Sequence, residues 1–362
     1  MSGRLHELLL VVHRWVALVA SVLILVVAVT GSALVFEGAM DRGLHPRLWR
    51  VTPAERRVSI DSMITSAKAA ASGAVVTVIT LPPLDDRAAL VQAGPNQIFV
   101  NPFTGAVQAR RSGTEWNATL PRRIHALHVS LMSGRAGGKI VGAITAIALF
   151  LVLSGVILWW RDKLWRVRWS ASWKRVIFDL HHSLGVIAAL VMLIIAASGV
   201  IMHYESLSKW IFSLDASPPP AAPTQPAGVA GAVSISSDSA YQVAMRTLPG
   251  ARATFLVLPL KPDQPFVVAM RFPEDHTPGG RSRVFVDRFT GSALLATSTR
   301  QAQIGSRIGN ALRSIHTGDL FGKPTEAIWL AAAIILASQA LTGAMMWWNG
   351  RRGRAALARP RA

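Results

Sequence analysis

Cysteine is absent from this chain of 362 residues. Its absence excludes disulfides, thiolate metal sites, iron–sulfur clusters and the attachment motif of c-type haem. Any metal or haem must therefore be held by histidine, of which there are ten. The glycine-rich nucleotide loops, the zinc-protease helix motif and the serine nucleophile elbow are also missing. The sequence gives no support to hydrolysis or to a built-in flavin or nicotinamide domain.

Charged residues are missing from four long apolar runs. Each run is long enough to cross a bilayer, which needs about 20 helical residues. The runs are Trp15–Phe36, Ile140–Trp160, Leu184–Met202 and Ala327–Trp348. The first is too long for a signal peptide and is not followed promptly by a small-residue cleavage site, so we expect a retained anchor. Hydrophobic residues make up 51% of the chain, and we expect an integral protein of the lipid bilayer.

Acidic residues are scarce, with 19 Asp and Glu against 38 Lys and Arg. Much of the excess charge lies beside the apolar runs, in segments 161–175 and 350–362 and near the N-terminus, so no nucleic-acid partner is expected. Positive flanks face the cytoplasm. The pattern predicts a multi-pass protein with both termini cytoplasmic. The long segments 37–139 and 203–326 then lie outside the membrane on the opposite side.

The order of features repeats along the chain. In the first and third runs a histidine precedes a glycine by eighteen positions, and the second and fourth runs show a histidine twenty-seven positions before a glycine. The pairs are His13 and Gly31, His181 and Gly199, His128 and Gly155, and His316 and Gly343. Each of these glycines follows Ser or Thr. We interpret the small doublets as close helix packing, with room for a porphyrin face as the alternative.

The segments outside the membrane also repeat. Phe99–Gly105 reads FVNPFTG and Phe285–Gly291 reads FVDRFTG, each a strand running into a turn. Short helices are expected upstream at 60–71 and 236–248. Strands are expected at 74–81, 88–93, 253–258 and 266–272. The fold class is therefore membrane α-helical: a four-helix bundle from a duplicated two-helix unit, with two small α+β domains outside the membrane.

The expected boundaries follow from this order. They are a first span at 1–37, an outside domain at 38–120, a lead-in with the second span at 121–161, a basic loop at 162–177, a third span at 178–204, a proline-rich linker at 205–233, a second outside domain at 234–305, a lead-in with the fourth span at 306–349, and a basic tail at 350–362.

Histidines at repeat-matched span ends are the candidate site residues. Ionisable groups near hydrocarbon are costly and usually functional. Two imidazoles that face each other across a helix bundle suit axial ligation of haem iron. His13 would pair with His181 or the adjacent His182 at the inner level, and His128 with His316 at the outer level.

Further candidates flank these positions. His125 shares a helix face with His128, and His203 ends the third span on the outer side. No acid–base catalytic residues are expected, because electron transfer needs axial ligands, burial and docking only. A single histidine at a membrane interface can also be an anchoring or snorkelling residue with no ligand. This alternative explains a matched pair in a duplicated bundle less well.

The chain resembles the PepSY-associated transmembrane-helix family over nearly its whole length. The resemblance is carried by VVHRWVALVASVLILVVAVTG and its echo DLHHSLGVIAALVMLIIAASG, by LHVSLMSGRAGGKIVG before LSGVILWW, by IHTGDLFGK before LTGAMMWW, and by NPFTG and DRFTG. It implies a bacterial inner-membrane protein with periplasmic domains, often in iron acquisition. Some members resemble haem-b-containing ferric-siderophore reductases. The family ligands would be His13, His181, His128 and His316, with His181 and His182 unresolved.

Two functions therefore stand as hypotheses. The first is a di-haem b membrane reductase that passes electrons from a quinol or a cytoplasmic donor to a periplasmic acceptor such as a ferric siderophore, releasing Fe(II). The second is a non-enzymatic PepSY membrane protein that binds or regulates a periplasmic peptidase or another partner. Only the first requires a chromophore.

Overall fold

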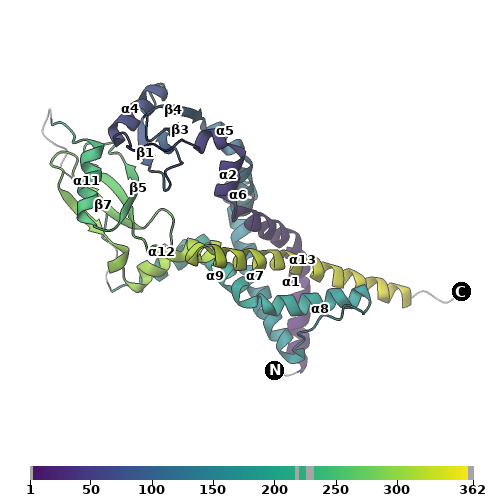
Figure 1. Cartoon of the computed structure of the whole chain (residues 1–362). Coiled ribbons are helices and arrows are strands. Elements are labelled where there is room, and N and C mark those ends of the chain that lie inside the picture. Colours follow the sequence, from purple (N-terminus) through teal and green to yellow (C-terminus); the bar gives the residue numbers. More distant parts are fainter. Residues whose placement is uncertain (1–2, 217–219, 226–231, 358–362) are drawn as a thin grey trace. The chain divides into compact units, whose positions relative to one another are not determined.

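The computed structural model describes residues 3–216, 220–225 and 232–357 (Figure 1). The chain divides into two compact units. The helical unit comprises 1–37, 123–209 and 312–362, and the sheet unit comprises 38–122 and 210–311. Much of the proline-rich stretch expected at 217–233 lies outside the described residues, as does the end of the basic tail.

The helical unit contains three helices that are long and apolar enough to cross a membrane, or four if one bent pair counts as a single span, among the described residues. The three are α1 (Gly3–Leu34), α7 (Gly134–Asp162) and α13 (Lys323–Leu357). The bent pair is α8 (Trp173–Ile187) with α9 (Ala189–His203). α1 packs against α7 and α13, and α9 packs against the same two helices.

The third apolar run forms a broken helix, whereas the sequence predicted one straight span. α8 and α9 meet at Ala188 with a bend of 66°. The turn before the break contains Ser183 and Gly185, small residues of the kind that accompany kinks. Gly185 lies close to α13, because a Cβ there would stand 3.1 Å from the Oε1 of Gln339. The apolar composition of the run identifies a possible span but does not show whether its helix is straight or bent.

Two short helices of the chain end inside the helical unit. α6 (Leu120–Ser130) carries His128 in its last turn, and α12 (Ile304–Thr317) carries His316 in the same position. Tight turns containing Leu131 and Met132, both with positive φ, separate α6 from α7. The histidines therefore sit on helices of their own and not on the long spans.

The sheet unit is one antiparallel sheet of eight strands in the order β4-β3-β2-β1-β5-β6-β7-β8 (Figure 1). The strands are β1 (Val76–Thr80), β2 (Ala89–Ala93), β3 (Asn96–Val100), β4 (Val107–Arg111), β5 (Arg252–Val257), β6 (Phe266–Arg271), β7 (Ser282–Val286) and β8 (Ala293–Thr297). The sequence predicted two separate α+β domains. Instead β1 pairs with β5, with Ile79 opposite Leu256, and the pairing removes one exposed edge from each half.

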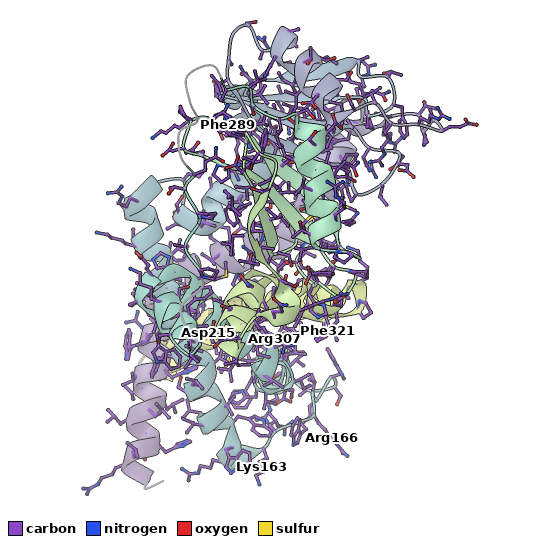
Figure 2. The ribbon with its side chains drawn as sticks, turned by 90° about the vertical axis from the view of Figure 1, so that its left-hand side faces the viewer. Lys163, Arg166, Asp215, Phe289, Arg307 and Phe321 are labelled. Atoms are coloured by element: carbon purple, nitrogen blue, oxygen red, sulfur yellow. The ribbon has the colours of Figure 1, made fainter. Side chains whose placement is uncertain are left out.

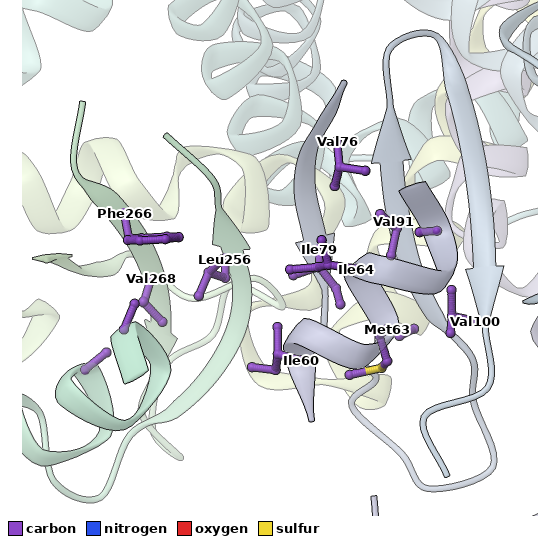
Figure 3. Close-up of a cluster of buried hydrophobic side chains, with 14 of the residues drawn as sticks. Ile60, Met63, Ile64, Val76, Ile79, Val91, Val100, Leu256, Phe266 and Val268 are labelled. Carbon is purple, nitrogen blue, oxygen red and sulfur yellow. The ribbon is translucent and has the colours of Figure 1, made fainter. Parts of the chain in front are cut away.

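A single hydrophobic core spans both halves of the sheet unit (Figure 3). α4 (Ile60–Ala70) and α11 (Ser237–Thr247) supply its helical layer. Ile64 of α4 and Ile79 of β1 are buried together with Leu256 and Val268 of the second half. Burial of this shared surface holds the two repeats together as one body.

The two core helices cap each other at their N-termini. The carboxylate of Asp238 accepts from the backbone N–H groups of Ile60 and Asp61 at 2.9 and 3.0 Å. Asp61 accepts in turn from Ser237 and Asp238 at 3.0 and 3.1 Å. Burial and the neighbouring carboxyl of Asp61 raise the pKa of Asp238. Reciprocal capping fixes the register of the two repeats.

Side-chain caps also fix the repeated turns and the start of α12. Asn101 Oδ1 accepts from the N–H groups of the FTG turn that follows it, and Asp287 Oδ1 does the same in the second repeat. Gly105 and Gly291 both have φ of +72°, a conformation that favours glycine. Asp215 (Figure 2) accepts from the first N–H groups of α12.

Candidate functional site

His128 and His316 face each other in the helical unit. Their ring centroids lie 6.3 Å apart and their planes are tilted by 47°. The two rings come from α6 and α12, which the repeat makes equivalent. The structure thus brings together the outer pair expected from the sequence.

Each of these rings is anchored by its Nδ1 to the first span of its own repeat half. His128 Nδ1 lies 2.9 Å from the carbonyl oxygen of Val27 on α1, and His316 Nδ1 lies 2.9 Å from that of Ile195 on α9. The hydroxyls of Thr30 and Ser198 approach the same nitrogens at 3.2 Å. A carbonyl oxygen can only accept, so Nδ1 carries the proton in both rings.

His13 and His181 show the related arrangement at the other level. His13 Nδ1 of α1 lies 2.8 Å from the hydroxyl of Ser154 on α7. His181 Nδ1 of α8 lies 2.9 Å from the hydroxyl of Thr342 on α13. No ring contact between His13 and His181 is found among the described residues, whereas the rings of His181 and His182 lie 5.8 Å apart. Each of the four imidazoles is therefore held by a helix of its own repeat half.

Each of the four hydroxyls can accept from its ring, because its own proton has a carbonyl partner within its helix. Each hydroxyl lies within hydrogen-bonding distance of a carbonyl oxygen one turn earlier in its helix, at 2.7 Å for Thr30, Ser198 and Thr342 and 3.1 Å for Ser154. A hydroxyl has one proton and two lone pairs. A neutral ring with its proton on Nδ1 has a free lone pair on Nε2.

The environment of the outer pair favours neutral imidazole. Burial, followed by the charge of the neighbouring His316, lowers the pKa of His128 to about 4. Burial also lowers the pKa of His316. Within the described part of the chain, the hydrogen bonds of all four rings use Nδ1 and none uses Nε2. Two neutral rings with free Nε2 atoms form a donor set suited to a metal.

A glycine lies against each ring, and at the outer level it leaves space that a larger side chain would take from the ring. A Cβ at Gly31 would lie 2.9 Å from Cε1 of His128, and one at Gly199 would lie 3.1 Å from Cε1 of His316. At Gly155 and Gly343 the distances to the rings of the inner histidines are 3.6 and 3.4 Å. The Ser/Thr–Gly doublets, which the sequence suggested were packing motifs, each contact one imidazole. The hydroxyl orients the ring, and at the outer level the glycine leaves space for it.

The two levels should respond differently when glycine is replaced by alanine. We expect Gly31→Ala to lower the free energy of unfolding by about 1–3 kcal/mol, because the added methyl overlaps His128. Gly155→Ala is the matched control, since its methyl would make an ordinary contact with His13. Thermal unfolding in detergent measures both. Equal melting temperatures for the two variants would contradict the tight fit at Gly31.

The remaining three candidate histidines make other contacts, although the ring of His182 also lies 5.8 Å from that of His181. His182 Nδ1 bonds the carbonyl of Phe178 in its own helix, 2.8 Å away, and its ring stacks on Phe178. His125 Nδ1 lies 3.4 Å from a carboxylate oxygen of Glu37. His203 packs on Gly142, where a Cβ would stand 2.0 Å from its ring. These three lack the doublet contact that the other four share.

The hydroxyl partners Thr30, Ser154, Ser198 and Thr342 were not recognised from the sequence as functional. Their signal was nevertheless present, because a hydroxyl residue precedes the glycine in all four doublets. Close packing requires only a small residue, so the recurrence of Ser or Thr was the informative feature.

The helices that are long and apolar enough to span a bilayer are those of a membrane protein. The chain belongs to the family of the PepSY-associated TM region, whose model matches residues 10–350. A comparison with curated proteins found no match.

Proposed function

We propose that this protein is a di-haem b electron-transfer protein of the bacterial inner membrane. The facing pair of His128 and His316 carries the proposal. In this proposal the four spans form a duplicated bundle, with the inner haem held by His13 and His181 and the outer haem by His128 and His316. No acid–base catalytic residue is invoked.

The facing rings of the outer pair support a haem site there. His128 and His316 would hold the iron through neutral imidazole nitrogens. The rings of His128 and His316 stand 6.3 Å apart. Within the described residues no group of three or more His, Asp or Glu side chains could hold a metal ion. Two protein ligands suit a haem, because the porphyrin supplies the other four.

Haem b, when bound, supplies reversible one-electron chemistry at low and tunable potential. The residues of this chain hold the ligands in the correct tautomer. The Nδ1 protons of His128 and His316 bond to backbone carbonyls, and this raises the basicity of the opposite nitrogen. The hydroxyls of Ser154 and Thr342 do the same for the inner pair, as weaker acceptors.

The direction of transfer follows from the basic segments. Lys163 and Arg166 lie in the connection between α7 and α8 (Figure 2). With the basic tail they support a cytoplasmic position for this side, because positive flanks face the cytoplasm. Both termini are then cytoplasmic and the sheet unit is periplasmic. Electrons would enter at the inner level from a quinol or a cytoplasmic donor and leave at the outer level.

The acceptor in this proposal is a ferric siderophore or another periplasmic oxidant. Chelators with hard oxygen ligands hold Fe(III) more strongly than Fe(II), because Fe(III) is the harder ion. One electron delivered to the chelate would therefore release iron. The family membership is compatible with this acceptor.

The test is a visible spectrum of the detergent-purified chain, oxidised and then reduced with dithionite. We expect b-type bands at two haems per chain, and reoxidation of the reduced protein by a ferric hydroxamate. Reoxidation by oxygen is excluded by working anaerobically, and a gallium hydroxamate serves as the redox-inactive control. A folded protein that stays colourless after expression with ample haem would overturn the proposal and favour the peptidase-binding hypothesis.

A further inference from the structure

A cavity of about 320 Å³ opens between α1 and α13 near the cytoplasmic ends assigned above. It is lined by Arg14, Trp15, Trp347 and Arg351. The two indoles meet edge-on with centroids 6.5 Å apart. The guanidinium of Arg351 lies 4.8 Å from the centre of the Trp347 ring. The cavity thus combines two cations with two interfacial aromatic rings.

The two arginines of the cavity have no acidic partner among the side chains that the structure describes. The two guanidiniums come from different helices and line one space. Such a pair favours an anion with several acceptor oxygens, because guanidinium bonds phosphate in a bidentate manner.

The repeat provides an internal comparison. The equivalent positions in the other half are His182, Ser183, Trp159 and Lys163. There the indole of Trp159 donates to the carbonyl of Leu164 at 2.9 Å and packs edge-on against Trp165 at 4.6 Å. The segment that connects α7 to α8 therefore occupies the position beside Trp159 that is equivalent to the cavity.

Within the described residues no connecting segment covers the cavity beside Trp347, because α13 continues as a helix to Leu357. In the part of the chain that the structure describes, the connecting segment thus occupies the position beside Trp159, whereas the related position beside Trp347 is an open cavity. The open cavity alone is lined by two arginines.

We propose that this cavity binds the phosphodiester headgroup of an anionic phospholipid. Arg14 and Arg351 would contact the phosphate oxygens, and Trp15 and Trp347 would lie at the level of the headgroups, where tryptophan is enriched. Basic pockets between spanning helices on the cytoplasmic side are suited to such lipids. Free phosphate presents the same oxygens, so the test must separate the two sources. This inference does not depend on haem.

The experiment is native mass spectrometry of the full-length protein, delipidated and then titrated with cardiolipin, phosphatidylglycerol or phosphatidylcholine. The test variant is Arg14→Gln with Arg351→Gln. The matched control is Lys163→Gln with Arg166→Gln, which removes two charges from the segment that connects α7 to α8. We expect one tightly held anionic lipid on the wild type and control. The test variant should bind it about thirtyfold more weakly, as expected for the loss of two interfacial cations.

Several outcomes would overturn the proposal. These are equal binding of phosphatidylcholine, equal weakening in the control, and displacement of the lipid by millimolar inorganic phosphate, which would identify a free-phosphate site. If the double variant does not fold, Arg14→Lys and Arg351→Lys singly retain the charge and remove the bidentate contact. Unchanged anionic-lipid binding by both would equally contradict the proposal.

Discussion

Replacing His316 by alanine is expected to remove one haem of the two, and replacing His128 should remove the same one. The two rings face each other at 6.3 Å, so they would serve one iron. The double variant His128→Ala with His316→Ala should therefore retain as much haem as either single variant. His13→Ala with His316→Ala should lose both haems. Haem per chain, measured by the pyridine haemochrome of purified protein, checks these numbers.

The controls come from histidines that the structure places outside the doublet contacts. His182→Ala and His203→Ala should each leave two haems per chain, because His182 bonds within its own helix and His203 packs on Gly142. Loss of a haem in His182→Ala would assign the inner ligand to His182 and not to His181. A double His128 and His316 variant that lost both haems would show that the pairing is wrong.

The spacing of histidine and glycine predicted the outer pair of rings, because the two halves of the chain repeat the same order of helices. The outer rings do meet, and the pattern of four doublets contacts four rings. The contacts of Thr30 and Ser154 with the histidine rings could not be predicted from the spacing. A hydroxyl in an apolar helix usually bonds its own backbone, and only the folded structure shows that it also accepts from a ring of another helix.

The sequence did not predict that the two α+β domains share one sheet, and the reason is different. The strands β1, β2, β5 and β6 lie where the sequence predicted strands, whereas β4 and β8 were not predicted. Strand periodicity fixes which face is buried and says nothing of which edge pairs with which. The contact between Ile79 and Leu256 links positions far apart in the sequence. The bend at Ala188 was also not predicted, because hydropathy measures how apolar a segment is and not whether its helix is straight.

The sheet unit also contains a buried ion pair that the sequence did not predict. Asp41 and Arg111 form a bidentate pair at 2.7 and 3.2 Å, with side chains 6% and 5% exposed. The Nε1–H of Trp49 donates to Asp41, and Arg111 Nε donates to Gln97. Asp41 lies in α2 (Glu37–Leu44) and Arg111 ends β4. The pair therefore joins the helix that follows the first span to the edge of the sheet.

We expect Asp41→Ala to destabilise the sheet unit by about 3–5 kcal/mol, because it leaves the Arg111 guanidinium buried without its counter-charge. Hydrogen exchange of β3 and β4 in the full-length protein measures the loss locally. The matched control is Asp85→Ala, which breaks an exposed pair with Arg57 and should cost about 0–1 kcal/mol.

The double variant Asp41→Ala with Arg111→Ala distinguishes a pair from two independent contributions. If burial of an unpaired charge causes the loss, removing both partners should cost less than the sum of the two single substitutions. Strictly additive losses would mean that Arg111 is held mainly by Gln97 and by its contact with Trp116, whose ring centre lies 4.2 Å from the guanidinium. In that case the aromatic and amide contacts, and not the ion pair, would fasten α2 to the sheet.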